Sequence, residues 1–207
     1  MKSAEAYITG IGQSEVGVRL TRSPLLLTLD AIREMQAEKP FGAKEVKKIS
    51  VHGSQVTMDH VGWKYQPLGL TSAQLNLPFC VATLLLEGAC FVEQFTEDIV
   101  ADPRRMALAE KVSVRHDDAI TALGAKFRHK VRVEVMLTDG TRLETTVEAP
   151  RGSEHNFASE ADVIAKFKSL AAHALPAAQV DALCDAMMNA ERLDDAAQLV
   201  RLMTVAE

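Results

Sequence analysis

The sequence lacks a long apolar run, and its charge balance is slightly negative. No apolar stretch reaches the roughly 20 residues that a membrane-spanning helix needs, so we expect no membrane span. The formal net charge over 207 residues is −5. This argues against nucleic acid as a partner, because such binding depends on Lys and Arg meeting phosphates. The first 17 residues contain acids and no apolar core of a secretion signal, so we expect a cytoplasmic protein.

Cysteine is scarce and its spacing matches no metal or redox motif. Cys80, Cys90 and Cys184 are odd in number, and no two of them form CxxC. We therefore expect reduced thiols that lie mostly in the core. A catalytic thiol at Cys80 or Cys90 is an alternative, although a reactive thiol needs electropositive surroundings and neither residue has a base near it in sequence.

Signatures of metal and nucleotide sites are also missing. The six histidines form neither HxH nor HExxH, which predicts no metal site. Residues 10–17, GIGQSEVG, match neither GxGxxG nor a phosphate loop, and GxSxG is absent. We therefore expect no cofactor. His116-Asp117-Asp118 is the one tight cluster of histidine and carboxylates, and we interpret it as a solvated turn rather than a catalytic base.

The patterns that are present predict an α+β protein in three parts. Residues 1–40 read as a short strand at Ala6–Thr9, a glycine-rich loop, and a helix capped by Ser23 with Pro24 at its first position. Residues 41–155 read as a small α+β domain with an antiparallel sheet packed by helices. Residues 156–207 read as further helices.

Within the middle part, we expect strands at 46–55 and 112–115 and short helices at 91–99 and 102–110. Residues 55–70 read as irregular. They hold Trp63 and Tyr65, which makes them too aromatic for a linker, so we expect this segment to pack over a core or a cavity.

Residues 130–137 and 141–148 predict a β-hairpin, because apolar and polar residues alternate in both. The turn contains Asp139-Gly140, which suggests a two-residue loop. That register, however, would pair Val135 with Glu144. A three-residue loop over 138–140 pairs Val135 with Leu143 and keeps one face apolar. We therefore expect three residues in the loop, with Gly140 in the left-handed conformation.

Residues 72–88, SAQLNLPFCVATLLLEG, form a nearly uncharged run with polar side chains at its start. We expect a buried helix that begins near Asn76 or Leu77, because Pro78 belongs in a first turn, and that ends at Gly88. Ser72, Gln74 and Asn76 would place polar groups where the N-terminal end of this helix opens onto a cavity.

The C-terminal part reads as three helices. Ser159 and Asp162 have the spacing of a capping box, and Val163, Phe167, Leu170 and Ala174 form one stripe. Pro176 starts a second helix with Val180, Leu183, Cys184 and Met187, and a third covers about 193–203.

Four of these pieces together resemble the C-terminal part of the MmgE/PrpD family, from about Ala43 to Met203. They are VHGSQ at 51–55, AQLNLPFCVATLLLEG at 73–88, KVRVEVMLTDGTRLETTVEAPRG at 130–152, and ASEADVIAKFKSLA at 158–171 with the helices after it. The family contains dehydratases, decarboxylases and epimerases that act on small di- or tricarboxylic acids without a metal. Its active site lies in a cleft between a helical domain and this α+β domain.

The resemblance implies that Ser72, Gln74, Asn76 and Phe79 bind substrate on one wall of the cleft. Two of them depart from the family pattern, which usually has serine at the position of Asn76 and tyrosine at that of Phe79. The tyrosine hydroxyl would be a donor to a substrate oxygen. Phe79 cannot supply it, and simple packing is the alternative role for this side chain.

The family's helical half, with most of its acid/base residues, has no counterpart in these 207 residues. Instead, residues 1–35 resemble the start of a thiolase, without the thiolase cysteine and histidine motifs. The resemblance therefore implies a component of a lyase that needs a helical-domain partner chain. The alternative is a non-catalytic binding or scaffold protein that forms a homo-oligomer through its C-terminal helices. A thiolase-type acyltransferase would fit only the first 35 residues.

Overall fold

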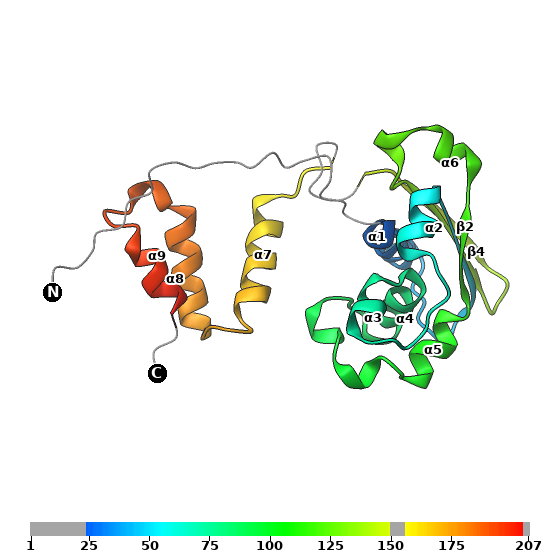
Figure 1. Ribbon diagram of the computed structural model, residues 1–207, viewed down its shortest axis with the longest axis horizontal. Helices are drawn as coiled ribbons and strands as arrows, with labels where there is room; N and C mark the ends of the chain where they lie inside the picture. Colours follow the sequence, from blue (N-terminus) through cyan, green and yellow to red (C-terminus); the bar gives the residue numbers. More distant parts are fainter. Residues whose placement is uncertain (1–23, 150–155, 205–207) are drawn as a thin grey trace. The chain divides into compact units, whose positions relative to one another are not determined.

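The computed structural model describes residues 24–149 and 156–204, which belong to two compact units (Figure 1). Within the described residues, the larger unit ends at Asn156 and contains the sheet, and the smaller unit runs from Phe157 onward and is helical. The predicted strand at Ala6–Thr9, the glycine-rich loop and most of the thiolase-like start lie outside the described residues.

Four described strands form one mixed sheet in the larger unit, in the spatial order β2-β1-β3-β4. They are β1 (Val46–Gly53), β2 (Val112–His116), β3 (Val131–Leu137) and β4 (Arg142–Val147). The α+β class is confirmed. β1, β3 and β4 are antiparallel as expected, whereas β2 adds a parallel edge to β1 that the sequence did not reveal. A parallel pair needs a long crossover, which the helices between β1 and β2 supply.

The β3–β4 hairpin has the predicted register. Val135 pairs with Leu143 and Val131 with Val147, and the Leu137 amide donates to the Thr141 carbonyl at 2.9 Å. Gly140 has a φ of +88°, so the three-residue loop and its left-handed glycine are both confirmed. The apolar face of β3 is buried as a result.

Strand β1 ends two residues earlier than expected, and a helix follows it directly. A Cβ on Gly53 would lie 2.7 Å from the Thr57 hydroxyl, so only glycine lets the chain turn this tightly. The next helix, α2 (Gln55–Val61), replaces the first half of the segment that we expected to be irregular.

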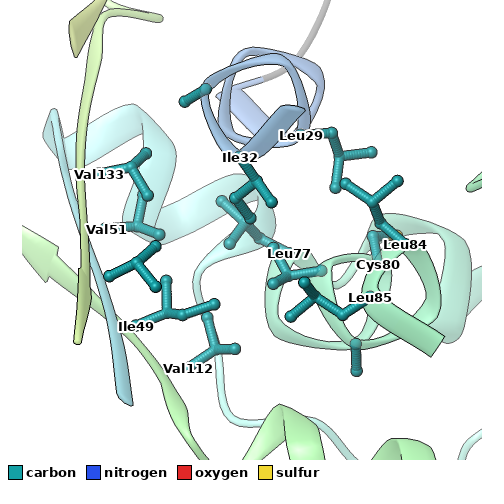
Figure 2. Packing of buried hydrophobic residues seen from close by; sticks show 14 of the residues in the cluster. Leu29, Ile32, Ile49, Val51, Leu77, Cys80, Leu84, Leu85, Val112 and Val133 are labelled. Carbon is teal, nitrogen blue, oxygen red and sulfur yellow. The ribbon is translucent and has the colours of Figure 1, made fainter. Parts of the chain in front are cut away.

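The core lies between one face of the sheet and two helices, α1 (Pro24–Glu38) and α4 (Leu77–Glu87). In Figure 2, Ile49, Val51, Val112 and Val133 of the sheet point toward Ile32 of α1 and Leu77 of α4. Helix α4 is buried nearly all round, as its uncharged sequence predicts. The opposite face of the sheet carries charged residues such as Arg132, Glu134 and Glu144.

Shorter helices complete the larger unit. They are α3 (Leu70–Leu75), α5 (Pro103–Ala109) and α6 (Asp118–Ala122), with 3₁₀ turns at Val92–Gln94, Glu97–Ile99 and Ala125–Phe127. The helix expected over 91–99 is wrong: extended backbone at Thr96 divides it into two 3₁₀ turns. Strand β2 and helix α5 lie close to where the sequence placed them.

The smaller unit contains α7 (Glu160–Ala171), α8 (Ala177–Met188), a 3₁₀ turn at Ala190–Arg192 and α9 (Ala197–Met203). Ser159 and Asp162 form the predicted capping box. Helix α9 starts later than expected, where the Asp195 carboxylate accepts the Ala197 amide at 2.9 Å. Across the described ranges 24–149 and 156–204, no helix has the length and apolarity needed to cross a membrane.

Candidate functional site

The start of helix α4 is fixed by Asn76, whose side chain is fully buried. The Asn76 Oδ1 accepts the Phe79 amide at 2.9 Å, which makes Asn76 the N-cap of the helix. The Asn76 Nδ2 donates to the Trp63 carbonyl at 2.6 Å. One side chain therefore holds both the first turn of α4 and the loop that carries Trp63.

Phe79 lies behind this turn and is also fully buried. Its ring stacks on Tyr65, with the ring centroids 4.3 Å apart. The Tyr65 hydroxyl donates to the Val100 carbonyl at 2.7 Å, and burial raises the pKa of Tyr65. With Ala73 and Ile99, these rings form a second small core beneath the start of α4.

A groove of about 560 Å³ lies beside this small core. The α2–α3 loop contributes Trp63, Lys64 and Tyr65 to its lining, and α4 contributes Pro78. Met106 and Glu110 come from the region of α5, and Val112–Val114 from strand β2. The aromatic segment that we expected to pack over a core or a cavity does both.

The four residues proposed from the resemblance are near the groove in sequence, but none of them is part of its lining. Asn76 and Phe79 are buried beneath it. Ser72 is partly exposed, and its hydroxyl donates to the Gln66 carbonyl at 3.3 Å, while Gln74 is exposed. Of the 72–88 segment, Pro78 alone is in the lining.

The sequence reasoning missed Lys64 and Trp63 as site residues. The available signal was the position of two aromatic residues and a lysine between Gly62 and Pro67. In the structure Tyr65 packs in the small core and also borders the groove, whereas Trp63 is 37% exposed and lines it.

The groove is chemically simple. Its walls are mainly apolar, with Lys64 as the cation and Glu110 as the carboxylate among its lining residues. The start of α4 adds little to anion binding, because Pro78 has no N–H, Asn76 accepts the Phe79 amide, and the Cys80 amide donates to the Asn76 carbonyl. The lining can bind a small molecule, with Lys64 and Glu110 as its charged groups.

The other candidate groups are occupied in structural roles. Asp117 caps α6 by accepting the amides of Ala119 and Ile120, and His116 Nε2 lies 2.7 Å from the Thr121 hydroxyl. His116 is exposed beside this turn. Within the described part of the chain, no three His, Cys, Asp or Glu residues are grouped closely enough to hold a metal ion.

Cys80 and Cys90 lie next to each other. A hydrogen bond between the two thiols raises the pKa of Cys80, with burial adding to the shift, and lowers the pKa of Cys90. The Cys80 sulfur also lies 3.5 Å from the Ala73 carbonyl oxygen. Cys80 is part of the main core, so its environment is that of an inert buried thiol.

Comparison with known proteins identifies one family across most of the chain. Residues 26–190 match the MmgE/PrpD C-terminal domain. Cis-aconitate decarboxylase of Aspergillus terreus strain NIH 2624 is 24% identical over 184 residues, which cover 84% of this chain and 37% of that protein. Cis-aconitate decarboxylase-like protein oryM of Aspergillus oryzae is 21% identical over 183 residues, or 85% of this chain and 37% of that protein. The chain thus aligns with little more than a third of these relatives.

Proposed function

Since this chain belongs to the MmgE/PrpD family, we propose that its larger unit forms one wall of a lyase active site for a small di- or tricarboxylic acid. The observation that carries the proposal is the match to the family's C-terminal domain, which includes the whole segment around α4. The relatives named for cis-aconitate decarboxylation support the substrate class.

In this proposal, Ser72 and Gln74 contact the part of the substrate that extends out of the groove, since both have exposed surface but neither lines the groove. Asn76 and Phe79 support the same wall from within, and direct contact with substrate would require the loop above them to move. Lys64 supplies a positive charge for a carboxylate, and the apolar groove receives the carbon skeleton.

The reaction in this proposal removes or shifts a proton next to a carboxylate, with loss of water or carbon dioxide. Its acid and base groups would come from a helical domain outside these 207 residues, as the family resemblance implies. We therefore expect the chain alone to bind weakly and to release no carbon dioxide from cis-aconitate.

Binding can be tested by following the amide resonances of ¹⁵N-labelled protein during titration with cis-aconitate. We expect shifts confined to residues 63–65 and 72–80. Lys64→Ala should abolish them, whereas Lys47→Ala removes an exposed lysine of the same charge on β1 and should not. Shifts that are absent, or that respond equally to both variants, would refute the proposed wall.

Catalysis needs a second test. A helical half from a neighbouring reading frame would be co-expressed with this chain, and carbon dioxide release would be measured. We expect a complex with activity that decreases in Ser72→Ala, and no activity from either half alone. A stable complex without turnover, or no complex, would exclude the lyase role.

A second candidate function is non-catalytic self-association through the C-terminal helices. Its support is the smaller unit itself, where Phe157 is 80% exposed and Val163 and Val200 are 57% and 63% exposed. Exposed apolar residues in such number mark interfaces. Light scattering should show a dimer or larger species that Val163→Glu dissociates, with Lys166→Glu as the control on the same helix. A monodisperse monomer at high concentration would contradict this candidate.

A further inference from the structure

Two of the three thiols of the chain are in contact inside the larger unit. Cys80 lies near the start of α4 and is 1% exposed, as its place among the core leucines in Figure 2 shows. Cys90 follows the end of the same helix and is partly buried against the same core. A hydrogen bond joins the two thiols. The third thiol, Cys184, belongs to the smaller unit.

The two side chains differ in how firmly the backbone holds them. Cys80 is inside α4, where its amide donates to the Asn76 carbonyl at 3.0 Å and its sulfur lies 3.5 Å from the Gln74 carbonyl oxygen. Cys90 lies in irregular backbone beyond Gly88, whose φ of +73° ends the helix. A small shift of Cys90 would therefore bring its sulfur to the bond distance of about 2.05 Å in a disulfide.

Cys90 also has the electropositive neighbour that its sequence context lacks. The hydrogen bond from Cys80 lowers the pKa of Cys90, burial opposes this, and the positive charge of Arg33 on α1 adds to the lowering. The ion pair of Arg33 with Asp30 is long, at 3.6 Å, and exposed, so it neutralises little of that charge. A thiol with a lowered pKa and some access to solvent is the kind that reacts.

We propose that Cys80 and Cys90 form a reversible oxidation site, in which a hydroperoxide converts the two thiols into an intramolecular disulfide. The Cys90 thiolate attacks a peroxide oxygen and the O–O bond breaks. This leaves a sulfenic acid on Cys90 and releases hydroxide, which is protonated to water when the oxidant is hydrogen peroxide. The Cys80 sulfur then attacks the Cys90 sulfur. The S–S bond forms as the S–O bond breaks, and the hydroxyl leaves as water with the Cys80 proton.

The order of these steps follows from burial. Cys80 is enclosed by the core, so an oxidant in solution reaches Cys90 first. Cys80 needs no access to solvent for its part, because its target is the neighbouring sulfur. In total, two thiols lose two electrons and two protons, and one peroxide becomes two waters. A dithiol reductant reverses the change by thiol–disulfide exchange.

Peptide mass analysis of the oxidised full chain tests the site. The chain would be treated with hydrogen peroxide, alkylated in denaturant and digested with trypsin. Both cysteines fall in one tryptic peptide, residues 65–104, between Lys64 and the bond after Arg104. We expect this peptide to resist alkylation and to lose the mass of two hydrogen atoms, and dithiothreitol should reverse both effects. The chain should remain a 22.6 kDa species without reductant.

Single variants separate the two roles. Cys80→Ser removes the second thiol, so oxidation should stop at a sulfenic acid on Cys90 that dimedone traps. Cys90→Ser leaves Cys80 enclosed, and the peptide should then remain unoxidised under the same conditions. Cys184→Ser is the matched control and should form the disulfide as the unaltered chain does. Circular dichroism of each variant checks that it is folded.

The rate of oxidation as a function of pH tests the part played by Arg33. Because a nearby positive charge favours the thiolate, Arg33→Gln should shift the rate profile to higher pH. Arg142→Gln removes an exposed arginine of β4 and should leave the profile unchanged. A purely structural role of Arg33 would not move the profile, so equal profiles for the two variants would overturn the assignment of Cys90 as the attacking thiol.

The inference does not rest on the proposed lyase function, since its measurements follow the thiols alone. It is overturned if both cysteines of peptide 65–104 remain open to alkylation after peroxide treatment. Disulfides that join two chains, or that include Cys184, would overturn it as well. Oxidation of Cys80 at an undiminished rate in Cys90→Ser would refute the order of the two steps.

Discussion

At the scale of single residues, Asn76 has the clearest role. Its side chain both caps α4 and binds the Trp63 carbonyl. A serine at this position could still cap the helix, but it has no second donor long enough to hold the loop. Asparagine therefore adds a tie between α4 and the groove loop that serine could not make.

Asn76→Ala should destabilise the larger unit by about 2–4 kcal/mol, since it removes an N-cap and leaves the Trp63 carbonyl without its donor. Asn76→Ser should recover the part of the lost stability that comes from capping the helix. Urea unfolding followed by circular dichroism measures both, and Gln74→Ala serves as a control because that side chain is exposed. Equal losses for the alanine and serine variants would contradict the two-part role.

Asp102 and Arg105 join the end of α4 to the start of α5. The side chain of Arg105 is buried and donates to Asp102 and, at 2.7 Å, to Glu87. Hydrogen bonds from Arg104 and Arg105 lower the pKa of Asp102 to about 2, although burial opposes them. The carboxylate of Asp102 is 10% exposed, so solvent screens these contacts only weakly.

Because the folded pKa of Asp102 lies below its unfolded value, its contribution to stability is complete above about pH 4. The contribution should then fall as the pH decreases toward 2. Asp102→Asn should destabilise the unit by about 1–3 kcal/mol at pH 7, and the difference should disappear near pH 2. Urea midpoints across this pH range measure it. Glu97→Gln is the control, since within the described part of the chain Glu97 forms no ion pair. If the loss of unfolding free energy in Asp102→Asn did not change with pH, the electrostatic cause would be excluded.

At the scale of elements, the hairpin shows how strongly one glycine can set a register. A Cβ on Gly140 would meet no atom within 4 Å, so the sole obstacle to another residue is its φ of +88°. Gly140→Ala should lower the unfolding free energy by about 1–2 kcal/mol, because alanine must adopt the left-handed conformation. Gly140→Asn should lower it less, because asparagine tolerates that conformation. Thermal unfolding measures both. If both variants cost nothing, the loop would have to adopt another conformation.

The elements that the sequence predicted well are those fixed by neighbouring residues. The apolar alternation decided the hairpin register, Pro78 and Gly88 bounded α4, and Ser159 with Asp162 marked the start of α7. Each depends on contacts within a few positions, where local stereochemistry dominates.

The parts that could not be predicted depend on distant contacts. The pairing of β2 with β1 and the groove beside it bring together residues from the α2–α3 loop, α4, α5 and β2. Asn76 was expected to present its polar group to a cavity, but the Trp63 carbonyl, thirteen positions away, binds it in the interior. Periodicity gives the buried face of an element, but not which neighbour covers it.

At the scale of the whole molecule, the two units differ in how much core they hold. Both clusters of buried apolar residues come from the larger unit, while the described part of the smaller one buries Val180, Leu183 and Cys184. Three helices with so small a core have little to offset the conformational entropy of folding. The larger unit should therefore fold without the smaller one, whereas the smaller unit should not fold by itself.

A chain ending at Asn156 should unfold cooperatively with nearly the unfolding free energy of the full chain, because both clusters of buried apolar residues lie within it. A fragment from Phe157 onward should show weak helicity and no cooperative transition, since helices of 12 residues or fewer are marginal alone. Urea unfolding of the two fragments, followed by circular dichroism, measures their stability. The amide spectrum of the longer fragment checks that it keeps its native fold. A loss of several kcal/mol in that fragment would mean that the C-terminal helices contribute to the core of the larger unit, and the division into two units would have to be abandoned.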